Sequence, residues 1–482
     1  MLKYVDLQAN IKKRVQWCKL VDTLVSKKFD QWGACSNSLR KTFNVKSNDI
    51  QKSVDMDVVN SGTYGKVIKT TLKANPTYPV AIKKSFNQEI DEARRAVLVS
   101  ALVESEYNPH FVILIDHFHC EAKKSRPISV RIGYAEGYKQ IQKLQERIAE
   151  INQQSTSNRS NNAKIKQLQK EIDNIIVQSV PTIDEIKWTR NLKNQYMQKI
   201  QVFEDSPSLT TSTPIDTTTT LQVLTREQKD IYETATRVLD DMLARRKKLS
   251  ESEPYELFVM EYVDENMLDW VQTNKGSITT KQLYSCAFQV CAGIVSLLSY
   301  FGMVQNDLHI KNIMYNAVPS NATYIYDMGK DSEGRTFYYN VPLHGRLFKI
   351  IDFGLSTNIQ HTPYCDNLKT KNCTAWNRDM IEFFDNLVRL KMFPKNFREW
   401  AAYVLSKLKT SPVNSVKELV TIINIVFSDH IAQRYSLGPS FIHVTKPPTS
   451  KGQVTFQLQA SEKRRKVVVE NALKKKWFES SE

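Results

Sequence analysis

The 482-residue sequence predicts an α+β protein whose length suits a two-lobed enzyme with insertions. Short β-favouring runs lie between residues 54 and 120 and recur at Glu256–Val263. Helical apolar spacing covers Leu283–Phe301 and alternates through residues 380–445. Between these two helical stretches, two apolar runs each lead into a polar turn that carries an Asp. The hydrophobic fraction of 41% is sufficient for a substantial core around these elements.

The two polar turns carry the residues on which the functional prediction depends. The first has the sequence VQNDLHIKN and places Asp307 and Asn312 five positions apart on one loop. The second has the sequence KIIDFG and places Asp352 after a run that reads as a buried strand. One Asp could orient or deprotonate a hydroxyl, while the other Asp and the Asn hold Mg²⁺ on a triphosphate. The two turns together therefore indicate phosphoryl transfer, whereas either alone could be an unrelated Asp-bearing turn.

A glycine-bearing hairpin and a lysine-bearing strand provide candidate contacts for phosphates. Gly62 and Gly65 would let a hairpin backbone close over phosphates without Cβ clashes, although an ordinary turn explains two glycines as well. In the following PVAIKK segment, period-2 alternation places Ala81 and Lys83 on one face. Lys83 is therefore the candidate to reach the α- and β-phosphates.

The helix expected over Gln88–Glu104 offers a partner for this lysine. Glu92 lies at the edge of its buried stripe and is the first candidate to pair with Lys83, with Glu89 second. A solvent-facing Glu is the alternative interpretation.

Charge and cysteine content limit the environment of the protein. The formal charge of +16 indicates anionic partners, but it is spread along the chain, so no specific nucleic-acid site is predicted. Seven irregularly spaced cysteines favour a reducing compartment. A metal site at His361, Cys365 and Cys373 is a weak alternative. The longest apolar run, near residues 292–304, is short for a bilayer, and the N-terminus lacks the apolar core of a signal peptide, so we expect an intracellular protein with no membrane contact.

Residues 121–253 depart from the pattern of the surrounding fold. Two apolar seams at helical spacing, separated by the polar stretch Asn152–Asn162, predict a helical hairpin. The seams comprise Ile141, Leu144, Ile148 and Ile151, and Ile165, Leu168, Ile172 and Ile175. A flexible loop is expected at Ser206–Thr220 and a charged helix at Arg226–Leu249. The segment could be a docking arm for a partner or an idle surface insertion.

Two further features lie towards the C-terminus. Strand-favouring residues on either side of Gly329–Gly334 predict a β-hairpin. The basic clusters of the tail, which begin with Lys463-Arg464-Arg465-Lys466, could form a nuclear signal, but a solvated helix face is favoured.

These motifs resemble those of protein kinases. D-L-x-x-x-N at residues 307–312 resembles the kinase catalytic loop, and D-F-G follows at residues 352–354. The glycine hairpin resembles G-x-G-x-x-G-x-V, with Asn60 in place of the first Gly, and PVAIKK contains V-A-I-K. The stretch VPLHGRLFKIIDFG and the hairpin before it look like serine/threonine-protein kinases of large cytoplasmic DNA viruses such as iridoviruses. The resemblance covers roughly residues 55–120 and 255–385.

The resemblance implies a two-lobed protein kinase-like fold. It says nothing about the insertion or the tail, and the sequence outside the pattern predicts a long helical insertion in the N-lobe and a β-hairpin insertion before the DFG strand. The expected parts are an N-terminal helical extension (1–49), the first N-lobe segment (50–120), the helical insertion (121–253), the last N-lobe strand and hinge (254–264), the C-lobe (265–445) and a basic tail (446–482). The resemblance also implies an intracellular viral setting, in the host cytoplasm, the virion or the nucleus, and an unidentified protein substrate.

The resemblance assigns expected roles to individual residues. ATP would be held by Asn60, Gly62, Gly65, Val67, Ala81, Lys83, Glu92, Met260, Glu261 and Val263. Asp307 would accept the hydroxyl proton, His309 would stand where a γ-phosphate lysine is usual, and Asn312 and Asp352 would bind Mg²⁺. Asp379 would anchor the backbone of the catalytic loop.

Departures from the kinase pattern keep two other functions open. Gln305 and Asn306 replace the usual His and Arg, and no A-P-E follows Asp352. Without that Arg, we expect activity that does not require phosphorylation of the activation segment. A small-molecule kinase of the aminoglycoside or choline type uses a similar D-L-H-x-x-N sequence, and a pseudokinase scaffold would tolerate the altered residues.

Overall fold

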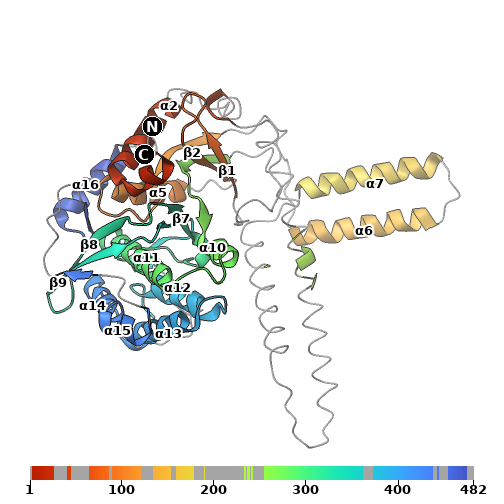
Figure 1. Cartoon of the computed structure of the whole chain (residues 1–482). Helices are drawn as coiled ribbons and strands as arrows, with labels where there is room; N and C mark the ends of the chain where they lie inside the picture. The colour runs from red at the N-terminus through yellow and green to blue at the C-terminus, as the bar shows by residue number, and fades with distance from the viewer. Residues whose placement is uncertain are drawn as a thin grey trace, which may run out of the picture. The chain divides into compact units, whose positions relative to one another are not determined.

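The computed structural model describes residues 3–26, 41–44, 65–85, 90–120, 134–153, 159–178, 255–361, 373–437, 442–444 and 454–474, and a few single positions between residues 189 and 242. The chain divides into two compact units (Figure 1). The first comprises Met1–Ile50, Asp55–Cys120 and Glu256–Glu482, and the second comprises Gln51–Val54 and Glu121–Tyr255.

A four-stranded sheet of order β1-β2-β4-β3 begins the first unit. Its strands are β1 (Gly65–Thr71), β2 (Pro79–Ser85), β3 (Leu114–Cys120) and β4 (Tyr255–Glu261), and the helix α5 (Ile90–Glu104) lies between β2 and β3 in the chain. The strand expected from Phe111 begins only at Leu114, because Phe111 instead forms an isolated bridge with Ile350. This bridge brings the chain before β3 next to the strand that leads to Asp352.

The N-terminal extension consists of α1 (Tyr4–Ala9) and α2 (Ile11–Ser26). Helix α2 contacts both α5 and β3, and α1 contacts β7. The apolar positions Val21 and Val25 of α2 are fully buried. The described part of residues 1–49 is therefore helical and packs within the first unit.

The remainder of the unit is mainly helical. In chain order it contains β5 (Glu265–Asn266), α10 (Met267–Thr273), α11 (Thr280–Phe301), β6 (Met303–Val304), η1 (Ile310–Asn312), β7 (Ile313–Ala317), β8 (Thr323–Lys330), β9 (Thr336–Pro342), β10 (Arg346–Ile350), β11 (Thr357–Asn358), η2 (Ile359–His361), α12 (Arg378–Arg389), α13 (Lys395–Thr410), α14 (Val416–Val426), α15 (Asp429–Arg434), β12 (Ile442–Val444), β13 (Thr455–Gln457) and α16 (Glu462–Leu473).

Helix α11 is the core helix and leads the chain into the first polar turn. A capping box formed by Thr279 and Gln282 begins it, and Gly302 ends it in the left-handed conformation with φ 58°. A Cβ on Gly293 would lie 2.7 Å from Ile350 Cδ1, so this glycine permits close packing on β10. By length and composition, α11 is the one helix in the described ranges that could cross a membrane, and 94% of its most apolar window is buried.

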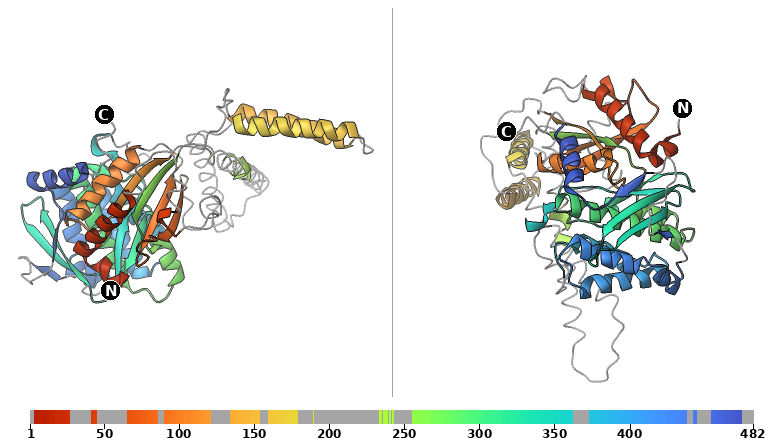
Figure 2. Two further views of the ribbon diagram at one scale, coloured as in Figure 1. Left: turned by 90° about the horizontal axis from the view of Figure 1, so that it is seen from above. Right: turned by 90° about the vertical axis from the view of Figure 1, so that its left-hand side faces the viewer.

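The predicted hairpin is present as β8 and β9, and it belongs to a larger sheet of order β12-β9-β8-β13. Strand β13 pairs parallel with β8, and the following α16 packs against α5 (Figure 2). Val468 and Ala472 of α16 are buried. Residues 454–474 of the expected basic tail are therefore attached to the fold, because their sparse apolar positions pack against it.

A buried histidine ties the loop before β3 to the strand that leads to Asp352. The backbone carbonyl of His110 accepts the Ile350 N–H at 2.9 Å. Its Nδ1 lies 2.8 Å from the Phe348 carbonyl and its Nε2 lies 2.7 Å from the Tyr326 hydroxyl. A carbonyl can only accept, so Nδ1 carries the proton and Nε2 accepts from Tyr326. The ring is thus held neutral.

This histidine is expected to make the protein sensitive to acid. Burial lowers the pKa of His110 from 6.5 to about 3. The unfolded chain therefore takes up a proton as the pH falls below 6.5, while the folded chain does not, and the free energy of unfolding decreases by about 1.4 kcal/mol per pH unit. The free energy of unfolding, measured by urea titration at several pH values between 7.5 and 5, should fall less steeply with decreasing pH for His110→Gln than for the wild type. An equal dependence on pH in the two proteins would contradict this prediction.

The second unit contains the predicted helical hairpin. Helices α6 (Tyr134–Gln153) and α7 (Arg159–Gln178) pack against each other through one apolar cluster. The cluster comprises buried Ile141, Leu144, Leu168, Ile172 and Ile175 and partly buried Ile148 and Ile151. The apolar seams therefore pair with each other as the spacing predicted. The expected loop at Ser206–Thr220 lies outside the described residues, as does almost all of the expected helix at Arg226–Leu249.

The cysteines differ in state. Cys18, Cys286 and Cys291 are free and buried. Cys120 and Cys373 are disulfide-bonded, whereas the irregular spacing of the cysteines favoured a reducing compartment. The proposed metal site at Cys365 lies outside the described residues, and no group of three or more His, Cys, Asp and Glu side chains within the described ranges could hold a metal ion.

Candidate active site

The ladder between β7 and β10 brings the two polar turns together. Ile313 lies opposite Ile350 in this antiparallel pair, and the Ile351 N–H donates to the Asn312 carbonyl at 3.0 Å. Asn312 therefore lies at the same end of the ladder as Asp352, which follows Ile351. The sequence placed the amide and this carboxylate 40 residues apart, and the sheet makes them neighbours.

Asp307 is held by the side chains around it. Asn312 Nδ2 donates to the Asp307 carbonyl at 2.9 Å and to its carboxylate Oδ2 at 3.3 Å. The Asp307 N–H donates to Gln305 Oε1 at 2.7 Å. The carboxylate is 37% exposed, so an acceptor molecule can reach it. Because the Asn312 amide nitrogen is used in these bonds, its oxygen Oδ1 is the atom that could bind a cation.

Gln305 connects the two turns directly. Its Nε2 donates to the Asp352 carbonyl at 2.7 Å and to the Ile351 carbonyl at 3.3 Å, while its Oε1 accepts from the Asp307 backbone. The side chain is fully buried. One amide thus fixes the spacing of the turns that carry the two carboxylates.

A buried carboxylate in α12 anchors the first turn. Asp379 Oδ2 accepts the Gln305 N–H at 2.7 Å, and Oδ1 accepts the Asn306 N–H at 2.9 Å. Asp379 is 3% exposed and lies in the first turn of α12, where a negative charge also complements the helix dipole. The sequence-based prediction that Asp379 anchors this backbone is confirmed.

Asn306 attaches the first turn to the segment after Asp352. Its Nδ2 donates to the Leu355 carbonyl at 3.1 Å and to Thr357 Oγ1 at 2.6 Å. Asn306 has φ 67° and Asp352 has φ 61°. Left-handed backbone at a non-glycine residue stores strain, and both turns that carry the candidate site contain one such residue; Glu106, His344 and Ser436 adopt it elsewhere in the described chain.

Lys83 lies between two carboxylates. Its Nζ forms a short ion pair with Glu92 Oε1 and lies 3.7 Å from Asp352 Oδ1. The strand register explains the direction of the Lys83 side chain. Lys83 on β2 lies opposite Val67 on β1 and opposite Phe258 on β4, so the three side chains share one face of the sheet. The pairing of Lys83 with Glu92 is thus the one expected from the sequence, and it joins β2, α5 and the second turn. Glu89 lies outside the described residues.

Helix α5 makes a second contact with the turn that carries Asp352. Arg95 Nη1 donates to the Gly354 carbonyl at 2.8 Å and to the Phe353 carbonyl at 3.3 Å. The Phe353 ring is buried and lies 6.1 Å from the Phe111 ring, between centroids. Arg95 was missed from the sequence, although its spacing of three residues from Glu92 places it on the same helix face.

Comparison with known proteins supports one interpretation of this geometry. The family described as protein tyrosine and serine/threonine kinase matches residues 237–383, and no curated protein matches the chain. The matched range contains Asp307, Asn312, Asp352 and Asp379. Residues 237–383 are therefore similar to a protein kinase domain. Lys83, which precedes the matched range, joins the site through its contact with Asp352.

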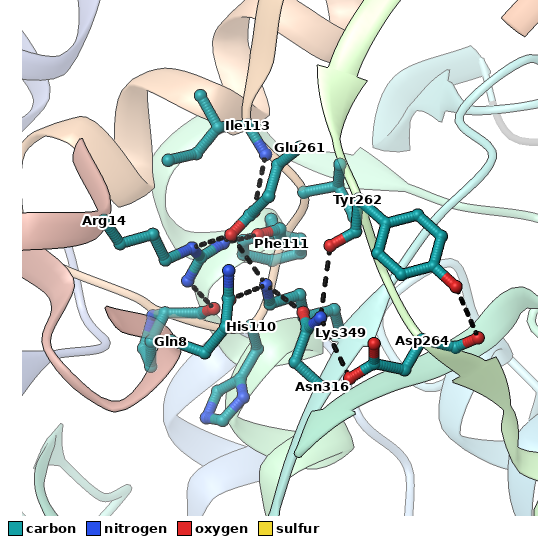
Figure 3. A network of polar contacts seen from close by, with 12 residues as sticks. Gln8, Arg14, His110, Phe111, Ile113, Glu261, Tyr262, Asp264, Asn316 and Lys349 are labelled. Carbon is teal, nitrogen blue, oxygen red and sulfur yellow. Dashed lines mark hydrogen bonds and ion pairs between the residues drawn. The ribbon is translucent and has the colours of Figure 1, made fainter. Parts of the chain in front are cut away.

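The predicted hinge lies at the end of β4. Ala81 lies opposite Met260 in the β2–β4 pair, so both face the side of the sheet that bears Lys83. The Glu261 side chain is fully buried and turns into a polar network behind the strand (Figure 3). Any contact of Glu261 with a nucleotide would therefore come from its backbone, and its carboxylate has a different role from the one expected.

The predicted glycine-bearing hairpin is described only in part. Gly65 begins β1, opposite Ser85, and Val67 is half-buried. Asn60 and Gly62 lie outside the described residues. Their contribution to phosphate binding stays a prediction.

His309 has two contacts in the predicted catalytic loop. Its Nδ1 accepts the Lys311 N–H at 3.2 Å, so a neutral ring carries its proton on Nε2. This Nε2 lies 3.8 Å from Asp307 Oδ2. The imidazole therefore presents a donor beside the candidate base.

The effect of low pH on Asp379, which anchors the first polar turn, can be tested. Burial raises the pKa of Asp379 to about 6. Glu382 lies one turn along α12, and burial and the charges of Asp379 and Asp307 raise its pKa to about 8. Asp379 can accept both N–H groups only as a carboxylate, so we expect kcat/KM to fall about tenfold per pH unit below pH 6. Asp379→Asn should lower the rate at pH 7.5 and flatten this acid limb. Circular dichroism at each pH would separate loss of rate from loss of fold, and an unchanged limb in the variant would contradict the assignment.

Proposed function

We propose that this protein transfers the γ-phosphate of Mg-ATP to a hydroxyl group of a protein, with serine or threonine as the acceptor. The observation that carries the proposal is the position of Lys83, which contacts both Glu92 and Asp352 at a turn joined to Asp307 by Gln305. A cation, a metal-binding carboxylate and a base are thereby held in one fixed arrangement. Phosphoryl transfer requires positioning and charge neutralisation of this kind.

The residues present fit a magnesium nucleotide. Asp352 and the amide oxygen of Asn312 are hard oxygen donors of the type that Mg²⁺ prefers, and Asp352 is 37% exposed. Bound there, Mg²⁺ would neutralise charge on the transferred phosphate. Two protein ligands leave the remaining coordination to phosphate oxygens and water, as is usual for this ion.

The side chains of the site then have distinct tasks. Lys83 would bind the α- and β-phosphates, and Glu92 keeps its ammonium group directed towards them. Asp307 would accept the proton of the attacking hydroxyl, with its carboxylate oriented by Asn312. His309 would supply a neutral donor near the γ-phosphate, where a lysine would supply a full charge.

Three observations support the finer parts of the proposal. The matched family acts on protein hydroxyls by its description, which favours a protein over a small alcohol. The preference for serine and threonine and the intracellular viral setting follow from the resemblance of residues 341–354. The α6–α7 hairpin buries its apolar seam within itself and leaves polar faces exposed, which suits a docking arm for a protein partner.

The decisive experiment is transfer of labelled γ-phosphate from Mg-ATP by the purified protein. Acidic and basic proteins and a set of small alcohols would be offered in parallel, with Asp307→Asn as the control. Label in protein that disappears in the control is the expected result, and phosphoamino-acid analysis then distinguishes serine and threonine from tyrosine. Label only in an alcohol would indicate a small-molecule kinase. Binding of ATP without transfer to any acceptor would indicate a scaffold.

A further inference from the structure

Arg14, Glu261 and Lys349 form a buried ion cluster behind the hinge (Figure 3). All three side chains are 0% exposed. Arg14 donates to both carboxylate oxygens of Glu261, from Nε to Oε1 at 2.5 Å and from Nη2 to Oε2 at 2.8 Å. Lys349 Nζ lies 3.0 Å from Oε1. A two-point guanidinium contact fixes the direction of a carboxylate as well as its charge.

The same guanidinium also holds the segment before β3. Arg14 Nη1 donates to the Pro109 carbonyl at 2.9 Å, and Nη2 donates to the Phe111 carbonyl. The Glu261 N–H in turn donates to the Ile113 carbonyl at 3.0 Å. One residue of α2 therefore sets the position of the hinge relative to the chain that contacts Phe353 and Ile350.

The N-terminal extension contacts the hinge at a second, adjacent residue. The Tyr4 hydroxyl on α1 donates to the Tyr262 carbonyl at 2.7 Å, and Gln8 Oε1 accepts from Lys349 Nζ at 2.8 Å. Asn316 on β7 also donates to the Tyr262 carbonyl, at 3.1 Å. Side chains from α1, α2 and β7 thus fix two successive hinge residues.

The chemistry of the ion cluster indicates that it positions the hinge more than it stabilises the fold. Burying three ionisable groups has a large desolvation cost, and well-packed apolar side chains would stabilise such an interior equally well. The ionised groups fix the orientation of the side chains, because their hydrogen bonds are satisfied in one arrangement only. That orientation is imposed on Glu261, the residue at which strand β4 becomes the hinge.

We propose that Arg14 is a positioning residue of the nucleotide site, which through Glu261 fixes the hinge backbone of Glu261–Val263 against which adenine would lie. The inference rests on the proposed ATP-dependent function. Contacts with adenine are remote from the transferred phosphate, so they contribute equally to the ground state and the transition state. Their loss raises KM for ATP and leaves kcat unchanged.

The test compares two ligands on the full chain. Arg14→Met and a control, Lys13→Met on the exposed side of α2, would be titrated by calorimetry with Mg-ATP and with magnesium tripolyphosphate, which lacks adenine. Arg14→Met should bind ATP about tenfold more weakly, the equivalent of one misplaced hydrogen bond, and bind tripolyphosphate as the wild type does. KM for ATP should rise in parallel while kcat is unchanged. Equal ATP affinity in variant and wild type, or equal weakening for both ligands, would overturn the inference.

Two milder variants keep the test decisive if Arg14→Met does not fold. Arg14→Lys retains the charge but not the two-point contact, and Tyr4→Phe removes one neutral hydrogen bond to the hinge. Each should weaken ATP binding by about threefold and leave tripolyphosphate binding unchanged. Wild-type affinity for ATP in both would overturn the inference. A wild-type protein that binds no Mg-ATP would instead overturn the proposed function. Failure of the proposed function can therefore be distinguished from failure of the inference about Arg14.

Discussion

Replacing Asp307 with Asn is expected to lower the rate of phosphoryl transfer by about 10²–10⁴-fold, the usual contribution of a general base. The carboxylate is the one group in this turn placed to accept a hydroxyl proton, with Asn312 Nδ2 at 3.3 Å to orient it. An asparagine of the same shape can hold a similar position, but it cannot accept the proton. Quenched-flow or steady-state assays with saturating Mg-ATP would measure the loss directly.

The control for this variant is Asp385→Asn, which removes a carboxylate of α12 that pairs with Arg389 on the surface. Its rate should equal that of the wild type, because Asp385 is not part of the candidate site and an i,i+4 pair whose arginine is 70% exposed contributes little. ATP affinity should be unchanged in Asp307→Asn, since in the proposed mechanism this residue would contact the acceptor and not the nucleotide. A variant that retains the full rate would show that Asp307 is not the base.

Contacts could be predicted from the sequence where the periodicity of a strand or a helix determines which way a side chain points. Lys83 points to Glu92 because alternation along β2 and helical spacing along α5 each fix one side chain. The apolar seams of α6 and α7 were predicted in the same way. Asp307, Asn312 and Asp352 were found because their motifs are short and their spacing is set by one loop and one strand.

Residues whose partners are distant backbone atoms could not be predicted. Gln305 binds the Asp352 carbonyl 47 residues away, and Asn306 binds the Leu355 carbonyl 49 residues away. Arg14 and Glu261 are 247 residues apart, and an arginine in an amphipathic helix carries no local sign of a buried partner. The replacement of the usual His and Arg therefore suggested weakened function, whereas the structure shows that Gln305 and Asn306 join the same two turns by hydrogen bonds. This connection argues against a scaffold that has lost its site.

The basic tail was predicted only for its solvated face. The four basic residues at 463–466 favoured a solvated helix face, and Lys463, Arg465 and Lys466 are exposed on α16. The helix is also attached to the fold, because Val468 on its opposite face is buried and Arg465 donates to the Ser299 carbonyl at 2.7 Å. Long basic side chains can cover apolar surface while their charged ends stay in water. Charge alone therefore did not reveal that this helix supports α5, the helix that carries Glu92.

Replacing Lys83 with Met is expected to lower kcat/KM by about 10²–10³-fold, the effect of removing one electrostatic contact to the phosphates of the nucleotide. The ammonium group lies between Glu92 and Asp352, so its loss also leaves two carboxylates that repel each other near the phosphates. Glu92→Gln should have a smaller effect, because Lys83 remains but is no longer oriented. The double variant should be no slower than Lys83→Met, since Glu92 acts through Lys83.

The matched control is Lys84→Met, one residue along β2 and on the opposite face of the sheet. It removes an equal charge from the same strand, so any effect of net charge or expression appears in both variants. We expect Lys84→Met to retain the wild-type kcat/KM. Equal losses in the two variants would show that the charge of β2, and not the position of Lys83, matters for the reaction. Additive losses in the Lys83 and Glu92 double variant would contradict the inference that the two residues act as one unit.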